Sequence, residues 1–365
     1  MRRYTIISTY PKQGSQNIGD NLISEATKNA IRHLKGDQVS FNVVWREARW
    51  DEVKDSIRGS DAVIFACLAI RKNMTTVEYP YLNHILKMNI PIGIIAAGTD
   101  LKMTDTSKNL FEGFSKDTIE ALTLLNEKAV FFTTRGYLSN SFCQYHGLDN
   151  VTHSGDIAFF DERFSKRRFG INRKINRIAI SDPHYPREFI PSFGYLVKRI
   201  HAVFPKSEIN GLLHGVNSQI ENYCKGKNIQ YRRIYEDPMH GLDSYDDFDL
   251  HIGYRVHAHV SALARRIPSY LLEQDGRGCD YGLTLGRKIT VSNFYDQTQG
   301  KWNLENILRA ALKKRLVVRK SLFPVDMLMA IVEADLLNGF RKFEGLENEI
   351  TEFNLACLNA LQKLP

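Results

Sequence analysis

Three residues in the stretch DLHIGYRVHAHVSALARRIPSYLLEQDGRG (residues 249–278) carry side chains suited to acid–base and anion-binding chemistry: Arg255, His257 and His259. They lie where an apolar run ends and an alanine-rich amphipathic segment begins. An imidazole exchanges protons near neutral pH, and a guanidinium binds a carboxylate or phosphate through paired hydrogen bonds. The pattern therefore predicts a strand that delivers an arginine and a histidine to a ligand at its carboxyl end, followed by a helix.

The helical phase distinguishes the two histidines. His259 flanks the stripe that such a helix would bury, so it is predicted to be a packed structural residue. His257 lies in the first helical turn on the other side of this stripe and is predicted to face the ligand. Its position at a helix N-terminus should lower its pKa. The buried stripe is formed by Val256, Val260 and Leu263.

A glycine-containing segment near the amino terminus, PKQGSQNIGDNLISEA (residues 11–26), has a second pattern typical of ligand loops. Gly14 and Gly19 permit a tight turn, and a helix expected to begin near Asp20 would offer unpaired N–H groups to an anion. The alternative is an ordinary capped helix with Asp20 as its N-cap.

The third candidate is the segment FFTTRGYLSN (residues 131–140), where Arg135 follows an apolar strand directly. At the carboxyl end of a strand, this arginine could bind a carboxylate or phosphate. The alternative is a surface arginine in a strand–helix loop.

The elements that would position these residues alternate between short apolar runs and amphipathic segments. In residues 1–160 the runs YTIIST, VSFNVVW, DAVIFACLAI, IPIGIIAAG and AVFFTT are separated by predicted helices. The alternation stops in a basic linker at 161–176, resumes over 177–302, and gives way to predicted helices over 303–365. Nearly all-apolar strands alternating with helices indicate parallel sheets covered on both faces. We therefore predict two tandem doubly wound, Rossmann-like α/β domains followed by a helical extension.

Composition limits the classes of function. The chain has 365 residues, of which 43% are hydrophobic and 25% charged, which is typical of a globular protein. No apolar run approaches the length that spans a bilayer, and the basic amino terminus is too quickly polar for a signal peptide. Five scattered cysteines without a C-x-x-C pair indicate free thiols and argue against a zinc site. We expect a cytoplasmic protein without a bound metal.

The formal net charge of +8 indicates an anionic partner. Phosphorylated metabolites and an acidic membrane surface both fit this charge. Nucleic acid is not expected, because aromatic residues are not interleaved with the basic clusters and no nucleic-acid-binding module is present.

Three motifs together resemble the polysaccharide pyruvyl transferase family. YRVHAHVSALARRIPSYLLEQDGRG is similar to the family's carboxyl-terminal signature, NIGDNLI to its amino-terminal glycine–aspartate motif, and RGYLS to its Arg-x-x-x-Ser motif. They occur in the family's order and bracket residues 17–280. The resemblance implies a fold like that of two-domain glycosyltransferases of the GT-B type, with the active site in the cleft between the domains.

The resemblance also implies a reaction: transfer of a pyruvyl group from phosphoenolpyruvate to a sugar, giving a ketal without a cofactor. Arg135 and Arg255 are then expected to bind the anionic donor, and His257 to act as general acid and base. Substrate contacts are expected from a larger set: Asn17, Gly19, Asp20, Ser139, Val256, Glu273 and Arg277.

The chain departs from the family pattern at several positions. Gly136 stands where an acidic residue usually follows the first arginine, and Gln274 and Arg277 replace a tyrosine and a lysine. FACLAIRKN replaces a glycine-rich loop. Two alternatives therefore stay open: a nucleotide-sugar glycosyltransferase, in which Glu273 would hold a ribose, and a non-catalytic carbohydrate-binding relative.

The carboxyl-terminal extension has two readings of its own. The basic cluster between Lys313 and Lys320 would suit peripheral contact with an anionic membrane and a lipid-linked acceptor. The apolar stripes of MLMAIVEADLL and FNLACLNALQKL instead indicate helices that pack against the protein or against a second copy in a homo-oligomer.

Overall fold

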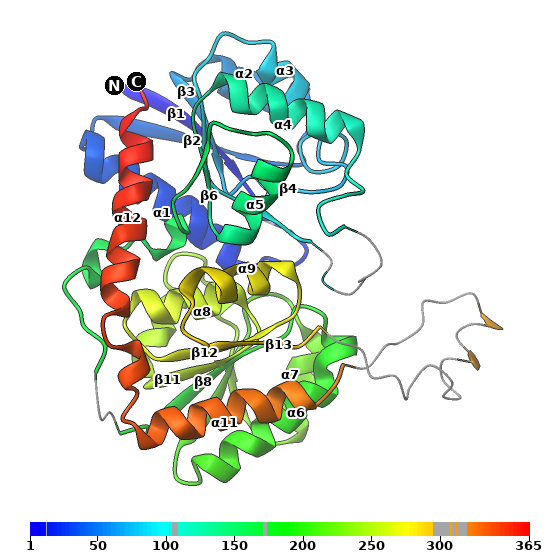
Figure 1. Ribbon diagram of the computed structural model, residues 1–365, viewed down its shortest axis with the longest axis vertical. Coiled ribbons are helices and arrows are strands. Elements are labelled where there is room, and N and C mark those ends of the chain that lie inside the picture. The colour runs from blue at the N-terminus through cyan, green and yellow to red at the C-terminus, as the bar shows by residue number, and fades with distance from the viewer. Residues whose placement is uncertain are drawn as a thin grey trace.

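The fold consists of two parallel β-sheets, each covered by helices on both faces (Figure 1). The computed structural model describes residues 1–11, 13–101, 103, 109–170, 174–294, 307–308, 311–312 and 320–365. The predicted α/β class with two Rossmann-like sheets is confirmed. Helices expected over residues 303–315 fall almost entirely outside the described residues.

The first sheet has seven strands among the described residues, in the order β2-β1-β3-β5-β6-β7, with β4 paired to β5. Every pairing is parallel. The strands are β1 (Arg2–Ser8), β2 (Val39–Trp45), β3 (Ala62–Ala66), β4 (Ala69–Ile70), β5 (Ile92–Thr99), β6 (Ala129–Thr134) and β7 (Val151–His153). Strands β3 and β5 are buried along their whole length, as expected of a sheet packed on both faces.

The second sheet has six described strands in the order β10-β9-β8-β11-β12-β13, again all parallel. The strands are β8 (Arg177–Ser181), β9 (Glu208–Leu212), β10 (Gln230–Arg232), β11 (Leu250–Gly253), β12 (Ser269–Glu273) and β13 (Thr290–Ser292).

The helices agree with the predicted segments in most places. They are α1 (Ile18–Lys35), α2 (Trp50–Arg58), α3 (Leu82–Leu86), α4 (Lys116–Lys128), α5 (Tyr137–Tyr145), α6 (Pro186–Val203), α7 (Ser218–Gly226), α8 (Val256–Ala264), α9 (Gly276–Leu285), α11 (Phe323–Leu337) and α12 (Leu346–Gln362).

Helix α1 begins earlier than the sequence indicated. Asp20 lies inside its first turn, and Asn17 is the N-cap, because the Asn17 side chain accepts a hydrogen bond from the amide of Gly19. Asn17 also donates to the Asp20 carboxylate at 2.9 Å. The expectation that Asp20 is the cap was therefore wrong by one turn of helix.

The strand expected over DAVIFACLAI is divided. Cys67, between β3 and β4, has a φ of +61°, which interrupts the ladder. The interruption leaves the Cys67 side chain at the carboxyl end of the sheet, 3.7 Å from the guanidinium of Arg135, which follows β6.

The basic linker packs against the second half of the molecule through ion pairs. Arg163 and Arg167 form ion pairs with Asp243 and Asp246 of the second half, at 3.2 and 3.0 Å. Residues 171–173 of the linker lie outside the described residues.

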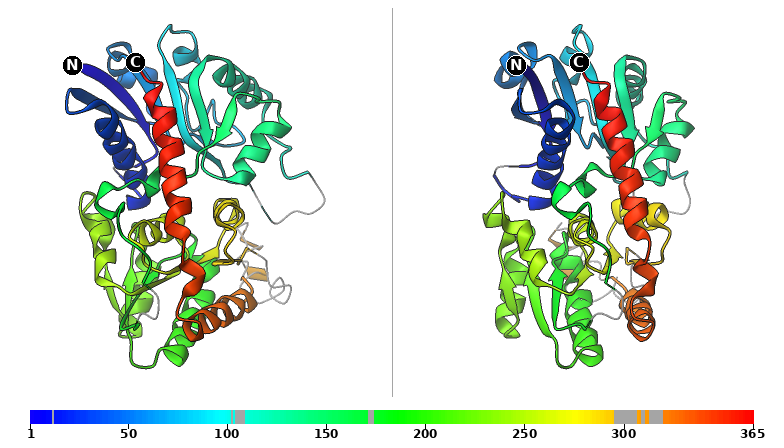
Figure 2. Two further views of the ribbon diagram at one scale, coloured as in Figure 1. Left: turned by 60° about the vertical axis from the view of Figure 1, so that its left-hand side comes forward. Right: turned by 90° about the vertical axis from the view of Figure 1, so that its left-hand side faces the viewer.

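The carboxyl-terminal helices connect the two halves of the molecule. Helix α11 packs on α6, β12 and β13, and α12 then runs back to α1, β5 and β6 (Figure 2). The chain ends beside its beginning, where Tyr4 donates to the Pro365 carbonyl at 2.5 Å. The apolar faces of α11 and α12 are therefore buried within the chain. Most of the basic cluster between Lys313 and Lys320 lies outside the described residues.

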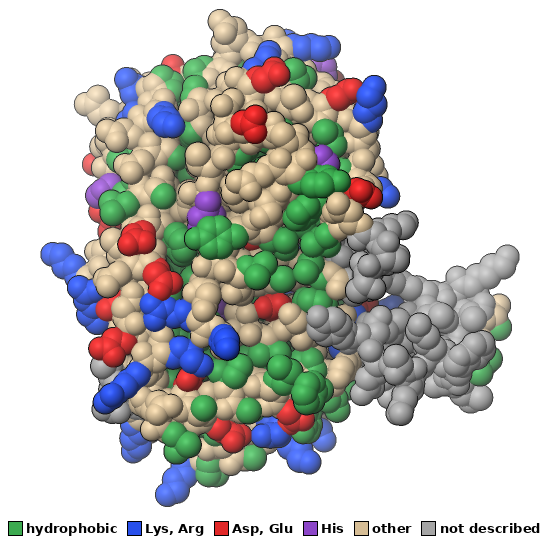
Figure 3. All heavy atoms as spheres, in the orientation of Figure 1, with side chains coloured by type: hydrophobic (Ala, Val, Ile, Leu, Met, Phe, Trp, Pro, Cys, Tyr) green, Lys and Arg blue, Asp and Glu red, His purple; other side chains and the backbone are tan. Residues whose placement is uncertain are grey.

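Basic and acidic side chains are interspersed on the face shown in Figure 3, where no large patch of one sign is seen. Among the described residues, no helix is long and apolar enough to cross a membrane.

Candidate active site

A cavity of about 450 Å³ lies between the carboxyl ends of the strands of the two sheets. Its walls come from the segments after β1–β6 in the first half and after β8, β9, β11 and β12 in the second. The structure brings seven of the residues predicted to act at the site into this wall: Asn17, Asp20, Arg135, Arg255, Val256, His257 and Arg277. Gly19, Ser139 and Glu273 are not part of it.

His257 lies in the first turn of α8, two residues after the N-cap Arg255. Its side chain is 12% exposed, and its Nε2 is buried 3.9 Å from the Asp156 carboxylate without a hydrogen-bond partner. Burial lowers the pKa of His257, while the negative charges of Asp156 and Asp20 oppose this shift. At neutral pH the free protein therefore holds a neutral imidazole that is ready to accept a proton.

Gly19 does not line the cavity but packs against the His257 side chain. A Cβ on Gly19 would lie 2.6 Å from both Cβ and Nδ1 of His257. Only glycine allows α1 to approach α8 this closely, so Gly19 fixes the position of the histidine ring.

Asp156 follows β7 and caps a 3₁₀ turn (Ile157–Phe159) that packs between α1 and α8. Its carboxylate is fully buried and accepts hydrogen bonds from the Ala158 amide and the Tyr281 hydroxyl. Asp156 is not among the residues predicted from the sequence, although an aspartate that lies between a strand end and an apolar run is a pattern typical of a site residue.

We expect Asp156→Asn to lower the pKa of His257 further, because removal of a nearby carboxylate destabilises the imidazolium. The amide oxygen of asparagine can still cap the 3₁₀ turn, so the fold should persist. Titration of the histidine ring by NMR measures the shift directly. Asp161→Asn, at an exposed neighbouring cap that pairs with Arg163, should leave the titration unchanged. An unchanged or raised pKa in Asp156→Asn would contradict this role.

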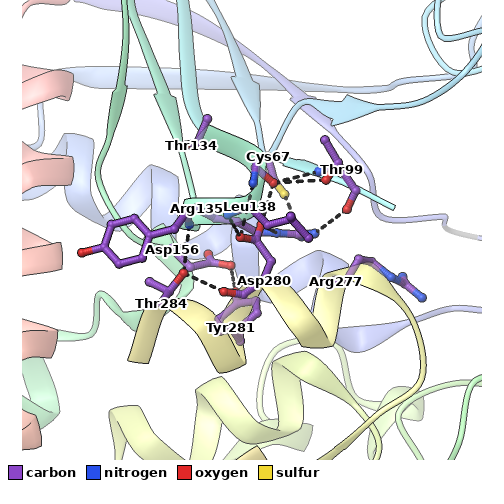
Figure 4. A network of polar contacts seen from close by, with 12 residues as sticks. Cys67, Thr99, Thr134, Arg135, Leu138, Asp156, Arg277, Asp280, Tyr281 and Thr284 are labelled. Carbon is purple, nitrogen blue, oxygen red and sulfur yellow. Dashed lines mark hydrogen bonds and ion pairs between the residues drawn. The ribbon is translucent and has the colours of Figure 1, made fainter. Parts of the chain in front are cut away.

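Arg135 is 5% exposed and extends from the end of β6 into the cavity wall (Figure 4). Its Nη2 donates to the Thr99 carbonyl at 3.1 Å, and Nη1 contacts the Cys67 sulfur at 3.7 Å. Its Nε is buried 3.9 Å from the Asp280 carboxylate and makes no hydrogen bond. A buried guanidinium with an unused donor is equipped to bind an anion.

Arg255 is held by a carboxylate that the sequence did not identify. Its Nε and Nη2 donate to both oxygens of the fully buried Asp182, at 3.2 and 2.7 Å. Its Nη1 lies 2.9 Å from Nδ1 of His184. Burial and the positive charge of Arg255 lower the pKa of His184 to about 4, so this imidazole is neutral and accepts the bond.

Comparison with known proteins identifies the family. The model of the family "Polysaccharide pyruvyl transferase" matches residues 17–276. The chain belongs to this family. No curated protein matches the chain.

The fold of this pyruvyl transferase family member is GT-B-like. It resembles a solved structure of a putative UDP-N-acetylglucosamine 2-epimerase from Listeria monocytogenes, with a TM-score of 0.51 and 10% identity over 95% of this chain and 90% of the other. The apo structure of OtsA is similarly related, with a TM-score of 0.50 and 10% identity over 99% of this chain and 97% of the other. At this level of identity the likeness concerns the fold alone.

The departure of this family member at Gly136 has a structural explanation. A Cβ at position 136 would lie 2.2 Å from the carboxylate of Asp280, which comes from α9 in the other half. Asp280 accepts hydrogen bonds from the Leu138 amide at 2.8 Å and the Ser139 hydroxyl at 2.6 Å. Asp280 thus supplies the acidic group beside Arg135, and Ser139 serves to hold it.

Glu273 faces away from the cavity. Its carboxylate accepts hydrogen bonds from Thr290 and Ser292 on β13, at 2.5 and 2.7 Å, and is buried. Burial raises the pKa of Glu273. In this arrangement it stabilises the edge of the second sheet rather than contacting a ligand.

Within the described residues, no group of three or more histidine, cysteine, aspartate or glutamate side chains is arranged to hold a metal ion. The cavity wall also contains two arginines that were not predicted to be site residues, Arg46 after β2 and Arg71 after β4. Each follows a strand directly, which is the same signal that identified Arg135.

Proposed function

We propose that the protein transfers the pyruvyl group of phosphoenolpyruvate to two hydroxyl groups of a sugar in a polysaccharide or glycan precursor, forming a cyclic ketal and releasing phosphate. One observation carries this proposal. In a member of the pyruvyl transferase family, Arg135 from the first half and Arg255 and His257 from the second half line one cavity, with side chains that are 5%, 11% and 12% exposed. The donor is a small anion with a carboxylate and a phosphate, and arginines that line the cavity are its expected partners.

The chemistry requires proton transfers that balance. A proton adds to C3 of the donor, a sugar hydroxyl oxygen bonds to C2, and the phosphate leaves with the electron pair of the C2–O bond. The second hydroxyl oxygen then bonds to C2. Of the two hydroxyl protons released, one replaces the proton delivered to C3 and the other accompanies the phosphate. No cofactor is needed for these steps.

His257 is the proposed carrier of these protons. Its pKa is lowered in the free protein, but the negative charge of a bound donor would raise it and favour protonation. The donor would thereby bring His257 into the acidic form needed at C3, and loss of that proton would leave a base for the attacking hydroxyl.

Ligand-induced stabilisation separates this proposal from its alternatives. Phosphoenolpyruvate should raise the melting temperature, with a stabilisation of about 2.7 kcal/mol at a hundred times the Kd. The shift should disappear in Arg135→Gln and persist in the surface variant Arg49→Gln. Stabilisation by a nucleoside diphosphate alone would indicate a nucleotide-sugar transferase, and stabilisation by neither would indicate a non-catalytic relative. The nucleotide reading has less support, because Glu273 does not line the cavity.

A further inference from the structure

Two arginine–aspartate ion pairs, one from each half of the molecule, lie in the wall of the cavity. In the first half, Nη1 of Arg71 lies 3.0 Å from the Asp100 carboxylate. In the second half, Nε and Nη2 of Arg277 donate to Asp275 at 3.1 and 2.6 Å. Both arginines line the cavity, and the functions assigned so far give Arg71 no role.

A backbone contact between the halves brings the two ion pairs together. The amide of Gly276 donates to the Leu101 carbonyl at 3.1 Å, and a Cβ on Gly276 would lie 2.4 Å from that oxygen. Leu101 follows Asp100 directly, and Gly276 lies between Asp275 and Arg277. The contact therefore joins the two halves at the point in the cavity wall where the two ion pairs meet. It requires glycine at position 276.

The two arginines retain donors that their aspartates do not use. Nη1 of Arg71 is buried, and its contact with Asp100 is too poorly aligned for a hydrogen bond. Nη1 of Arg277 has no hydrogen-bond partner within the described part of the chain. Burial lowers the pKa of Arg71, Asp100 opposes this, and repulsion from Arg277, Arg135 and Arg46 adds to the lowering. An anion bound at this position would relieve the repulsion.

Arg255 is less free to bind an anion. All three of its guanidinium nitrogens have partners, in Asp182 and His184. The cavity therefore has unused guanidinium donors at Arg135, Arg71 and Arg277, which suits a ligand with two separate anionic groups.

We propose that Arg71 and Arg277 together form a subsite that binds a phosphoryl group, while Arg135 binds a carboxylate. The placement of this subsite within a pyruvyl transfer reaction rests on the proposed function, whereas its affinity for phosphate does not. The phosphoryl group belongs either to phosphoenolpyruvate or to a phosphate on the acceptor.

Calorimetric titration with inorganic phosphate, pyruvate and phosphoenolpyruvate tests this subsite. Arg71→Gln should weaken phosphate binding by about 10- to 100-fold, because charged hydrogen bonds to the anion are lost. Pyruvate has no phosphoryl group, so its affinity should not change in Arg71→Gln and should fall in Arg135→Gln. Arg71→Lys keeps the charge without the paired donors and should give an intermediate loss for phosphate. Arg49→Gln, whose side chain is exposed and paired with Glu52, is the matched control.

The results also distinguish the source of the phosphoryl group. If Arg71→Gln weakens phosphate and phosphoenolpyruvate alike, the subsite binds the donor. If only phosphate is weakened, it binds the acceptor. If the wild-type protein binds phosphate through Arg71 but does not bind phosphoenolpyruvate, the subsite stands and the proposed function fails. Phosphate affinity that is absent in the wild type, or unchanged in a folded Arg71→Gln variant, would overturn the subsite.

Discussion

His257→Asn should reduce turnover by about a hundredfold or more while changing the melting temperature little. The expected loss is the usual contribution of a general acid or base. The side chain is partly exposed to the cavity, and its Nε2 makes no hydrogen bond that asparagine would break. Release of phosphate from phosphoenolpyruvate in the presence of acceptor measures turnover, and thermal unfolding measures stability. Donor affinity should be retained, because the proposed anion contacts come from arginines.

His259→Ala is the matched control, two residues along the same helix. His259 is fully buried, and its Nδ1 lies 2.7 Å from the Ser269 hydroxyl. Burial lowers the pKa of His259 to about 3, so the side chain is a neutral packing residue. The variant should lose about 1 to 3 kcal/mol of stability and keep turnover in the folded fraction. If His259→Ala abolished turnover while His257→Asn only lowered stability, the assignment of the two histidines would be reversed.

The sequence was sufficient to distinguish these two histidines, because their difference is local. Helix α8 begins at Val256, one residue after Arg255, so the phase counted along the sequence is the phase in the structure. The apolar strands were predictable for the same reason, since a buried parallel strand is apolar over its whole length. Local pattern also located the carboxyl ends of the strands, where the cavity lies.

The partners of the site residues could not be predicted, because they are far away in the sequence. Asp182 precedes Arg255 by 73 positions, and Asp280 follows Ser139 by 141. No spacing rule connects such residues: Asp182 meets Arg255 only when β8 and β11 pair in the second sheet, and Asp280 meets Ser139 only when the two halves pack together. Gly136 illustrates the consequence. In the sequence, it stands where an acidic residue is expected. In the fold, its lack of a side chain leaves room for the carboxylate of Asp280.

Arg255→Gln should abolish turnover and also destabilise the protein by about 3 to 5 kcal/mol, because it leaves a buried carboxylate without its counter-charge. The sequence predicts only a ligand-binding role for Arg255. The bidentate pair with the fully buried Asp182 adds a structural role. Arg232→Gln, which breaks an exposed ion pair with Asp247, should cost about 1 kcal/mol or less and serves as the control.

The pH dependence of this destabilisation identifies its cause. In the wild type, burial would raise the pKa of Asp182, but Arg255 and the His214 amide outweigh it and the pKa is lowered. The wild-type pair therefore stabilises the fold above the ordinary carboxyl pKa, and this contribution is lost as the pH falls through the lowered value. In Arg255→Gln the main opposing charge is gone, so burial should raise the pKa of Asp182 and stability should fall as the pH rises. Urea unfolding at pH 5 and pH 7 should show a smaller deficit at the lower pH.

The double variant Asp182→Asn/Arg255→Gln separates the structural from the chemical role of this arginine. Asp182→Asn removes the buried carboxylate charge that Arg255→Gln leaves without a counter-charge, so most of the lost stability should return. Turnover should stay lost if Arg255 acts on the substrate, because its guanidinium is still absent. Recovery of turnover together with stability would mean that Arg255 only neutralises Asp182. Catalysis would then depend on His257 and Arg135 and not on Arg255.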